Sequence, residues 1–161
     1  METRGFENVK NQIGFCGIWC GSCTSGNGAT QKLAEKFEAL AKKSQNQLET
    51  WAPKSFNFNE FMKGLTAIHS MPLCPGCRKG GGDPNCKIRI CALNKGLTDC
   101  SLCDQLLTCK NFEELERSHP KIKECLMGIN ENERAALIEK WVNELKTKWH
   151  HCILFCESTK K

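Results

Sequence analysis

The chain has 161 residues and a formal net charge of +5, and 13 of its residues are Cys. Hydrophobic residues make up 40% of it and charged residues 25%, and no apolar run approaches the ~20 residues that cross a bilayer. This composition excludes a membrane protein, and the length predicts one domain over residues 1–161. The first residues lack the basic start and apolar run of a secretory signal, so we expect a cytoplasmic protein.

Two amphipathic helices are predicted between residues 30 and 70, a stretch that contains no Cys. Apolar side chains recur there at helical spacing, in two runs: Leu33, Phe37, Leu40 and Ala41, then Phe58, Phe61, Met62, Leu65 and Ile68. Pro53 breaks the pattern between the two runs, and Asn57 or Asn59 is a suitable N-cap for the second helix.

A cysteine-rich module follows, from 74 to 109, with seven Cys in 36 residues. Its Gly-rich segment, 80–84, cannot form a helix or a central strand, so we expect a loop there. A short helix is predicted over about 86–95, because Ile88, Cys91 and Ala92 share one face and Gly96 supplies a stop.

The remainder of the chain is also predicted to be helical. Phe112 and Leu115 begin a short helix that Pro120 ends, and Ile122, Cys125 and Leu126 line another, with Cys125 expected in the core. Asn130 and Glu133 resemble a capping box, which opens a long helix. The apolar face of that helix comprises Ile138, Trp141, Val142, Leu145 and Trp149.

No segment alternates apolar and polar residues long enough to predict a strand. We therefore expect a mainly α fold, a small helical domain with an embedded Cys-rich metal-binding module, 74–109, built on zinc-knuckle-like turns. Without metal this module is expected to lose its fold, because it has few apolar residues to offset chain entropy.

The cysteines favour metal binding over disulfides, because thiols in a reducing cytosol do not persist as disulfides and an odd total leaves one unpaired. Ten of them are candidate metal ligands: Cys16, Cys20, Cys23, Cys74, Cys77, Cys86, Cys91, Cys100, Cys103 and Cys109. A CxxC turn aims two sulfurs at one ion, and two such turns complete a tetrahedral site.

The two CxxC pairs of the module, 74/77 and 100/103, form one such site in the simplest interpretation. Alternatively, Cys74 and Cys77 join Cys86 and Cys91 in one site, and the later cysteines join an N-terminal Cys in another. The sequence does not choose between these pairings.

The N-terminal triad of Cys16, Cys20 and Cys23 has the spacing by which radical S-adenosylmethionine enzymes hold a [4Fe-4S] cluster. This chain is too short and too helical for their partial barrel. The triad is better interpreted as three ligands of a closed site whose fourth ligand comes from the 74–109 module.

Four thiolates suit zinc or an iron-sulfur cluster, and we favour zinc because the spacings match neither common ferredoxin pattern. The favoured function is a thiolate metal-binding protein in a structural or interaction role. The alternative is an iron-sulfur protein, with a [4Fe-4S] cluster, in electron transfer or redox catalysis. No catalytic constellation can be defended from the spacing, so whether the protein is an enzyme stays open.

The expected partner is another protein, and the sequence does not indicate an oligomeric state. Five basic residues crowd the module: Arg78, Lys79, Lys87, Arg89 and Lys95. We expect them to neutralise thiolates rather than bind nucleic acid, because no aromatic residues are interleaved for base stacking.

Near the C-terminus, Cys152 and Cys156 are expected to pack the end of the last helix, and His150 and His151 to lie near the surface.

The cysteines and their neighbours together resemble a known family. The shared features are Cys16-Gly17-x2-Cys20-x2-Cys23, Cys74-x-Gly76-Cys77-Arg78, Cys86-x-Ile88-Arg89-x-Cys91-Ala92, Lys95-Gly96-Leu97, and Cys100-x2-Cys103 with Cys109. They span residues 16 to about 115 and look like those of the cysteine-rich archaeal and bacterial family catalogued as domain of unknown function 3795. The resemblance implies metal binding and supplies no established activity.

Overall fold

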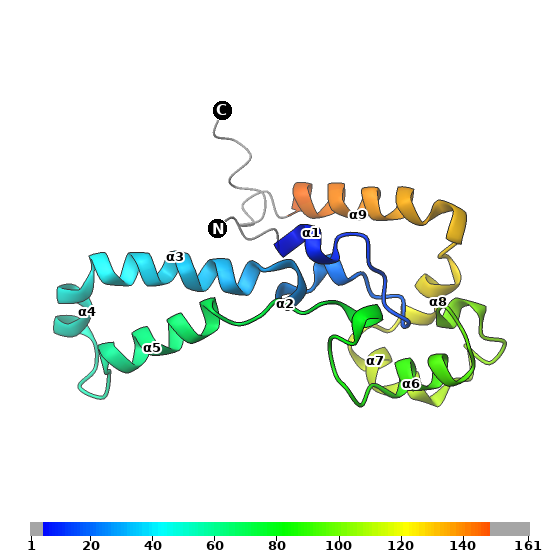
Figure 1. The fold of residues 1–161 in the computed structure, drawn as a ribbon, viewed down its shortest axis with the longest axis horizontal. Coiled ribbons are helices and arrows are strands. Elements are labelled where there is room, and N and C mark those ends of the chain that lie inside the picture. The colour runs from blue at the N-terminus through cyan, green and yellow to red at the C-terminus, as the bar shows by residue number, and fades with distance from the viewer. Residues whose placement is uncertain (1–4, 149–161) are drawn as a thin grey trace.

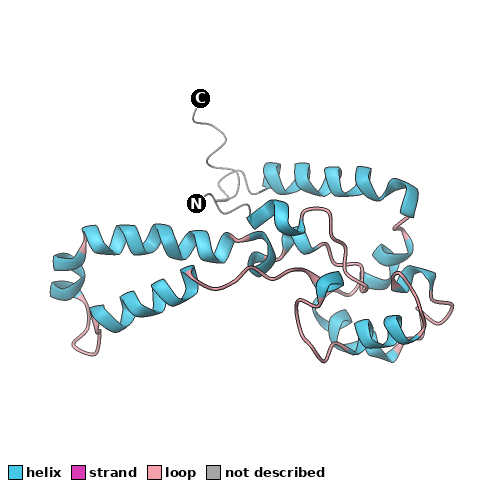
Figure 2. Ribbon diagram, in the orientation of Figure 1, coloured by secondary structure: helices cyan, strands magenta, loops and turns pink. Residues whose placement is uncertain are grey.

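The computed structural model describes residues 5–148, and within them the chain is helical with no strand (Figure 2). The backbone of Ile13 pairs with that of Trp19 in an isolated β-bridge. The α-helices are α1 (Gly5–Val9), α2 (Thr24–Asn27), α3 (Ala29–Lys43), α4 (Gln45–Trp51), α5 (Phe58–His69), α6 (Lys87–Asn94), α7 (Glu113–Ser118), α8 (Ile122–Met127) and α9 (Arg134–Lys148). The mainly α fold is thus confirmed, and none of these helices is long and apolar enough to cross a membrane.

Helices α3 and α5 form an antiparallel hairpin that projects from the rest of the molecule, with α4 at its tip (Figure 1). Both helices were predicted, and of the two candidate caps Asn57 is the one used, since its side chain accepts a hydrogen bond from the Glu60 N–H at 3.1 Å. The predicted apolar face of α3 is only partly covered. Ala34 and Ala41 are buried, whereas the three larger side chains are exposed to water, namely Leu33, Phe37 and Leu40.

The core lies at the other end of the molecule, around the segment between α1 and α2. Ile13, Phe15 and Trp19 from this segment pack with buried residues of the cysteine-rich module and of α8 and α9. Trp19 contacts the Trp141 ring of α9 at 5.9 Å between ring centroids and donates from Nε1 to the Lys10 carbonyl at 2.6 Å. The N-terminal segment therefore connects the module to the C-terminal helix.

The C-terminal part follows the predicted order of helices with two differences. A 3₁₀ turn, Glu131–Glu133, precedes α9, and the Asn130 side chain accepts from the Asn132 N–H at 3.1 Å, so the long helix begins at Arg134. Cys125 was expected in the core but is exposed, because α8 buries Ile122 and Leu126 instead. The expectations for the end of the chain lie outside the described residues, and they concern Trp149, His150, His151, Cys152 and Cys156.

Candidate metal centre

Four cysteines come together where two CxxC turns meet, and we call them the paired-turn group: Cys20, Cys23, Cys74 and Cys77. The 20/23 turn contains a short 3₁₀ helix, Cys20–Ser22, and the 74/77 turn leads into another, Cys77–Lys79. Cys74 is held beside the 20/23 turn by α1 and α2, since its N–H donates to the Ser25 carbonyl of α2 at 3.1 Å and its carbonyl accepts from Asn8 Nδ2 of α1 at 2.8 Å.

The sulfurs of the paired-turn group lie close enough to influence one another. Burial raises the pKa of the Cys20 thiol, a hydrogen bond from the Cys77 N–H opposes this, and the neighbouring thiols of Cys77, Cys23 and Cys74 raise the pKa further. Such a cluster of thiols resists forming several thiolates unless a cation compensates their charge. The donor set and the backbone N–H therefore fit a soft divalent ion such as zinc.

A Gly-rich loop packs directly against this group. A Cβ atom on Gly81 would lie 2.6 Å from Cys74 Sγ and 2.8 Å from the Gly76 nitrogen, so only glycine fits there. Arg89, a buried residue of α6, holds the same loop by donating to the Gly81 carbonyl at 2.5 Å and to the Asp83 carbonyl at 2.6 Å. The predicted loop is thus confirmed, with its path fixed by a buried arginine as well as by the cysteines beside it.

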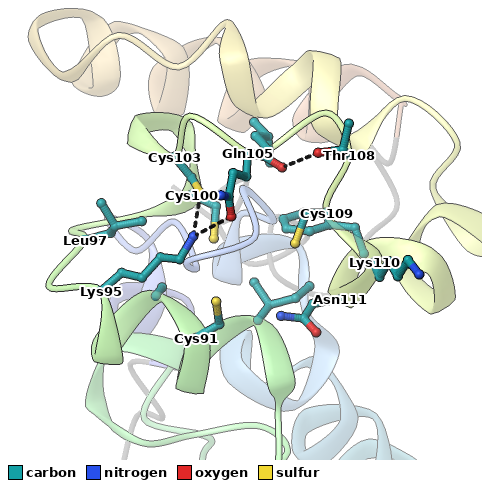
Figure 3. Close-up of a pocket in the computed structure, with 14 residues that line it drawn as sticks. Cys91, Lys95, Leu97, Cys100, Cys103, Gln105, Thr108, Cys109, Lys110 and Asn111 are labelled. Carbon is teal, nitrogen blue, oxygen red and sulfur yellow. Dashed lines mark hydrogen bonds between the residues drawn. The ribbon is translucent and has the colours of Figure 1, made fainter.

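Four more cysteines surround a second space, and we call them the pocket group: Cys91, Cys100, Cys103 and Cys109. Figure 3 shows their side chains around one cavity of about 320 Å³. Cys91 projects from the middle of α6, Cys100 begins a 3₁₀ turn, Cys100–Leu102, and Cys103 ends it. Cys109 precedes a second 3₁₀ turn, Lys110–Phe112.

Burial raises the pKa of the Cys100 thiol to about 12, and the nearby thiols of Cys103, Cys109, Cys91 and Cys16 add to the effect. Lys95 Nζ lies on the rim of the cavity, 3.6 Å from Cys103 Sγ and 3.1 Å from Gln105 Oε1. The negative charge of a Cys103 thiolate raises the pKa of Lys95, although burial lowers it. Of the five basic residues expected to neutralise thiolates, Lys95 thus lies beside a cysteine sulfur.

Cys16 and Cys86 complete the ten predicted ligands, and Cys16 lies near members of both groups. Burial raises the pKa of the Cys16 thiol, a hydrogen bond from the Ile18 N–H lowers it, and the thiols of Cys77 and Cys86 raise it. Cys16 also contributes to the raised pKa of Cys100. The Cys100 N–H donates to the Phe15 carbonyl at 3.1 Å, which holds the residue before Cys16 against the module.

The arrangement differs from both pairings considered for the module. The 74/77 turn faces the N-terminal 20/23 turn, and the 100/103 turn faces Cys91 and Cys109 across the cavity. Sequence reasoning did predict that an N-terminal cysteine cluster contacts the module. In residues 5–148 no group of three or more Cys, His, Asp or Glu side chains is arranged so that it could hold a metal ion.

Two of the basic residues expected to neutralise thiolates bind backbone carbonyls instead. Arg89 holds the Gly-rich loop, and Arg78 donates to the Ile13 carbonyl at 2.8 Å and to the Thr98 carbonyl at 2.6 Å. The Arg78 guanidinium also lies 5.1 Å from the centre of the Phe15 ring. Arg89 therefore stabilises the module internally, whereas Arg78 connects the module to the N-terminal segment.

Sequence reasoning missed Asp99, a buried carboxylate next to Cys100. It accepts hydrogen bonds from Arg134 Nη2 at 2.6 Å, from Arg78 Nη2 at 3.5 Å and from the Ser101 N–H and hydroxyl. Burial raises its pKa, but the hydrogen bonds from Ser101 and Arg134 outweigh that effect, so the pKa is lowered. An Asp just before a CxxC turn is a local capping signal that the sequence could have revealed. No signal in the sequence indicates that this Asp pairs with Arg134 on α9.

A family model described as "Protein of unknown function (DUF3795)" matches residues 12–114. Neither a comparison with curated proteins nor one with solved structures gives a significant match. The matched stretch includes every residue of the paired-turn group and the pocket group, together with Cys16 and Cys86. The chain therefore belongs to the DUF3795 family of proteins of unknown function.

Proposed function

We propose that this protein binds metal through two four-cysteine centres, the paired-turn group and the pocket group. The observation that carries the proposal is that distant parts of the sequence bring eight cysteines into two sets of four. Free cysteines that serve only as small buried hydrophobes have no reason to gather in this way. Four thiolates are the ligand set of structural zinc sites and of iron-sulfur clusters.

Zinc in a structural role is the favoured cofactor for the paired-turn group. Two CxxC turns are the usual way to build a closed tetrahedral zinc site, and the backbone N–H of Cys77 favours the thiolate form of Cys20. A zinc ion bound here would hold the N-terminal segment to the module. The proposed compartment is the cytoplasm, where reduced thiols remain available as ligands.

The proposed partner is another protein. Large apolar side chains of the module are exposed, with Leu93 at 60%, Leu102 at 64% and Leu107 at 65%. Exposed leucines beside a rigid, metal-held turn suit a protein interface. Nucleic acid is not favoured, because Arg78 and Arg89 are engaged with backbone carbonyls.

The proposal is tested by the metal content of protein purified without oxygen, measured by elemental analysis together with its visible absorption. We expect about two metal centres per chain, each with four thiolate ligands. Cys23→Ser and Cys109→Ser should each lose one centre, whereas Cys125→Ser, at an exposed thiol outside both groups, should lose none. Metal-free protein with a native helical spectrum and a cooperative melt would refute the proposal.

Chelation provides a second test of the structural role. Because metal binding to a thiolate site is coupled to folding, a strong chelator should lower the melting temperature and abolish protection of the module's amides from exchange. The α3–α5 hairpin contains no cysteine and should keep more of its protection. Equal protection before and after complete metal removal would contradict a structural role.

A further inference from the structure

We infer that the two centres take different cofactors: the pocket group holds an iron-sulfur cluster of the [4Fe-4S] kind, and the paired-turn group holds zinc. This inference rests on the proposed function, that both groups bind metal. It goes further by assigning each group its own chemistry from the space around its sulfurs.

The first argument is the space between the ligands of the pocket group. Four sulfurs at the Zn–S distance of 2.3 Å from one ion lie about 3.8 Å apart, in mutual contact, and leave no room between them. The pocket group instead lines a cavity of about 320 Å³. An iron-sulfur core carries its own inorganic sulfide and spaces its cysteine ligands more widely, so it fills such a cavity without requiring its walls to collapse.

The second argument is the contrast with the paired-turn group, where backbone packs directly against the sulfurs. A Cβ on Gly81 would meet Cys74 Sγ at 2.6 Å and the Gly76 nitrogen at 2.8 Å, closer than side-chain carbons approach such atoms. Hydrogen bonds also hold Cys74 to the helices on either side of the 20/23 turn, since its N–H donates to the Ser25 carbonyl of α2 and its carbonyl accepts from Asn8 Nδ2 of α1. Such crowding suits a single ion, which needs only a small inward movement of the sulfurs.

The third argument is how the chain supplies the ligands. The paired-turn group consists of two CxxC turns, each of which converges on one point. The pocket group has only one CxxC turn, and its other two members come from the α6 helix and from the start of the Lys110–Phe112 turn. Ligands fixed on separate rigid elements around a space match the corners of a polynuclear core better than a single ion.

The cavity also holds a group suited to adjusting a cluster. Lys95 Nζ donates to Cys103 Sγ at 3.6 Å and to Gln105 Oε1 at 3.1 Å (Figure 3). A positive charge that hydrogen-bonds a ligating sulfur stabilises the reduced state, which carries one more negative charge, and so raises the reduction potential. Lys95 is exposed, so its replacement tests this role without disturbing the core.

The decisive experiment measures zinc, iron and acid-labile sulfide in full-length protein purified without oxygen. We expect one zinc with about four iron and four sulfide per chain, and a broad absorption near 400 nm. Two zinc and no iron would leave the proposed function standing and overturn this inference, as would iron without sulfide. Protein with neither metal would refute both.

Variants then assign the cofactors to their groups. Cys109→Ser should lose the absorption near 400 nm and keep zinc, and Cys23→Ser should lose zinc and keep the absorption. The opposite pattern, or loss of both cofactors in folded protein, overturns the assignment.

Lys95→Gln should keep the cluster but lower its reduction potential. The potential is measured by titration with dithionite, which supplies the one electron that reduces the cluster. Lys87→Gln is the matched control, an exposed lysine of α6 outside the cavity lining, and should not change the potential. An unchanged potential in Lys95→Gln overturns the role of Lys95.

Discussion

Replacing Asp99 with Asn should destabilise the metal-bound protein substantially, because this side chain joins the cysteine-rich module to α9. It is 2% exposed and lies within hydrogen-bonding distance of Arg134 on α9 and of Arg78 in the module. Asn keeps the shape of the side chain and an oxygen that can accept the Ser101 N–H. The substitution therefore removes the charge and little else.

The expected cost follows from the contacts that lose their charge. A hydrogen bond to a charged group contributes about 1.5–3 kcal/mol, and removing one partner of a buried ion pair costs about 3–5 kcal/mol. The two arginine side chains are 29% and 21% exposed, so water recovers part of this loss. We expect the free energy of unfolding to fall by about 2–3 kcal/mol, which lowers the melting temperature by roughly 4–12 °C in a protein of this size.

The assay is urea unfolding followed by far-ultraviolet circular dichroism, with the metal content of each sample measured first. Glu139→Gln is the control, since it removes one exposed carboxylate from the same helix as Arg134 and should change stability by less than about 0.5 kcal/mol. In a double-mutant cycle, Asp99→Asn and Arg134→Gln should show non-additive losses. If Asp99→Asn behaves like the control, or if the losses add, the buried carboxylate does not join α9 to the module.

Two further predictions use matched pairs of substitutions. Gly81→Ala should lower the free energy of unfolding by about 1–3 kcal/mol and weaken metal retention, because the new Cβ would meet Cys74 Sγ. Gly64→Ala is the control: its Cβ would have nothing within 4 Å, and it should stabilise α5 by about 0.5–1 kcal/mol. Equal effects of the two substitutions in thermal melts would contradict the close packing at Gly81. Asn57→Ala should lower the free energy of unfolding by about 1 kcal/mol through loss of the N-cap, whereas Asn59→Ala, inside the helix, should change it little. Amide hydrogen exchange in α5 distinguishes the two variants. Similar exchange rates in both would argue against Asn57 as the cap.

Much of the local structure could be predicted from the sequence, because it depends on short-range patterns. The spacing of Phe58 and Leu65 indicates α5. Gly96, with a φ of 65°, follows the end of α6, where a stop was expected. The Gly-rich loop follows from the conformational freedom of its glycines. The family resemblance, carried by cysteine spacing, is confirmed over residues 12–114.

The tertiary structure alone decided which cysteines meet. The 20/23 turn lies about fifty residues before the 74/77 turn, and spacing contains no information on how the chain between them folds back. That chain forms the α3–α5 hairpin, whose two helices run out and return, so its ends come together beside the core (Figure 1). The pairing of turns is therefore a consequence of the hairpin.

Burial of polar groups was likewise decided by tertiary packing. Asp99, Arg78 and Arg89 are ordinary charged residues in the sequence, and their roles arise only because distant carbonyls and an arginine of α9 lie beside them. Cys125 fits a helical apolar pattern and yet is exposed, because α8 buries only Ile122 and Leu126 of that pattern. Periodicity locates a helix and its apolar face, but the packing of the whole chain determines how much of that face is covered.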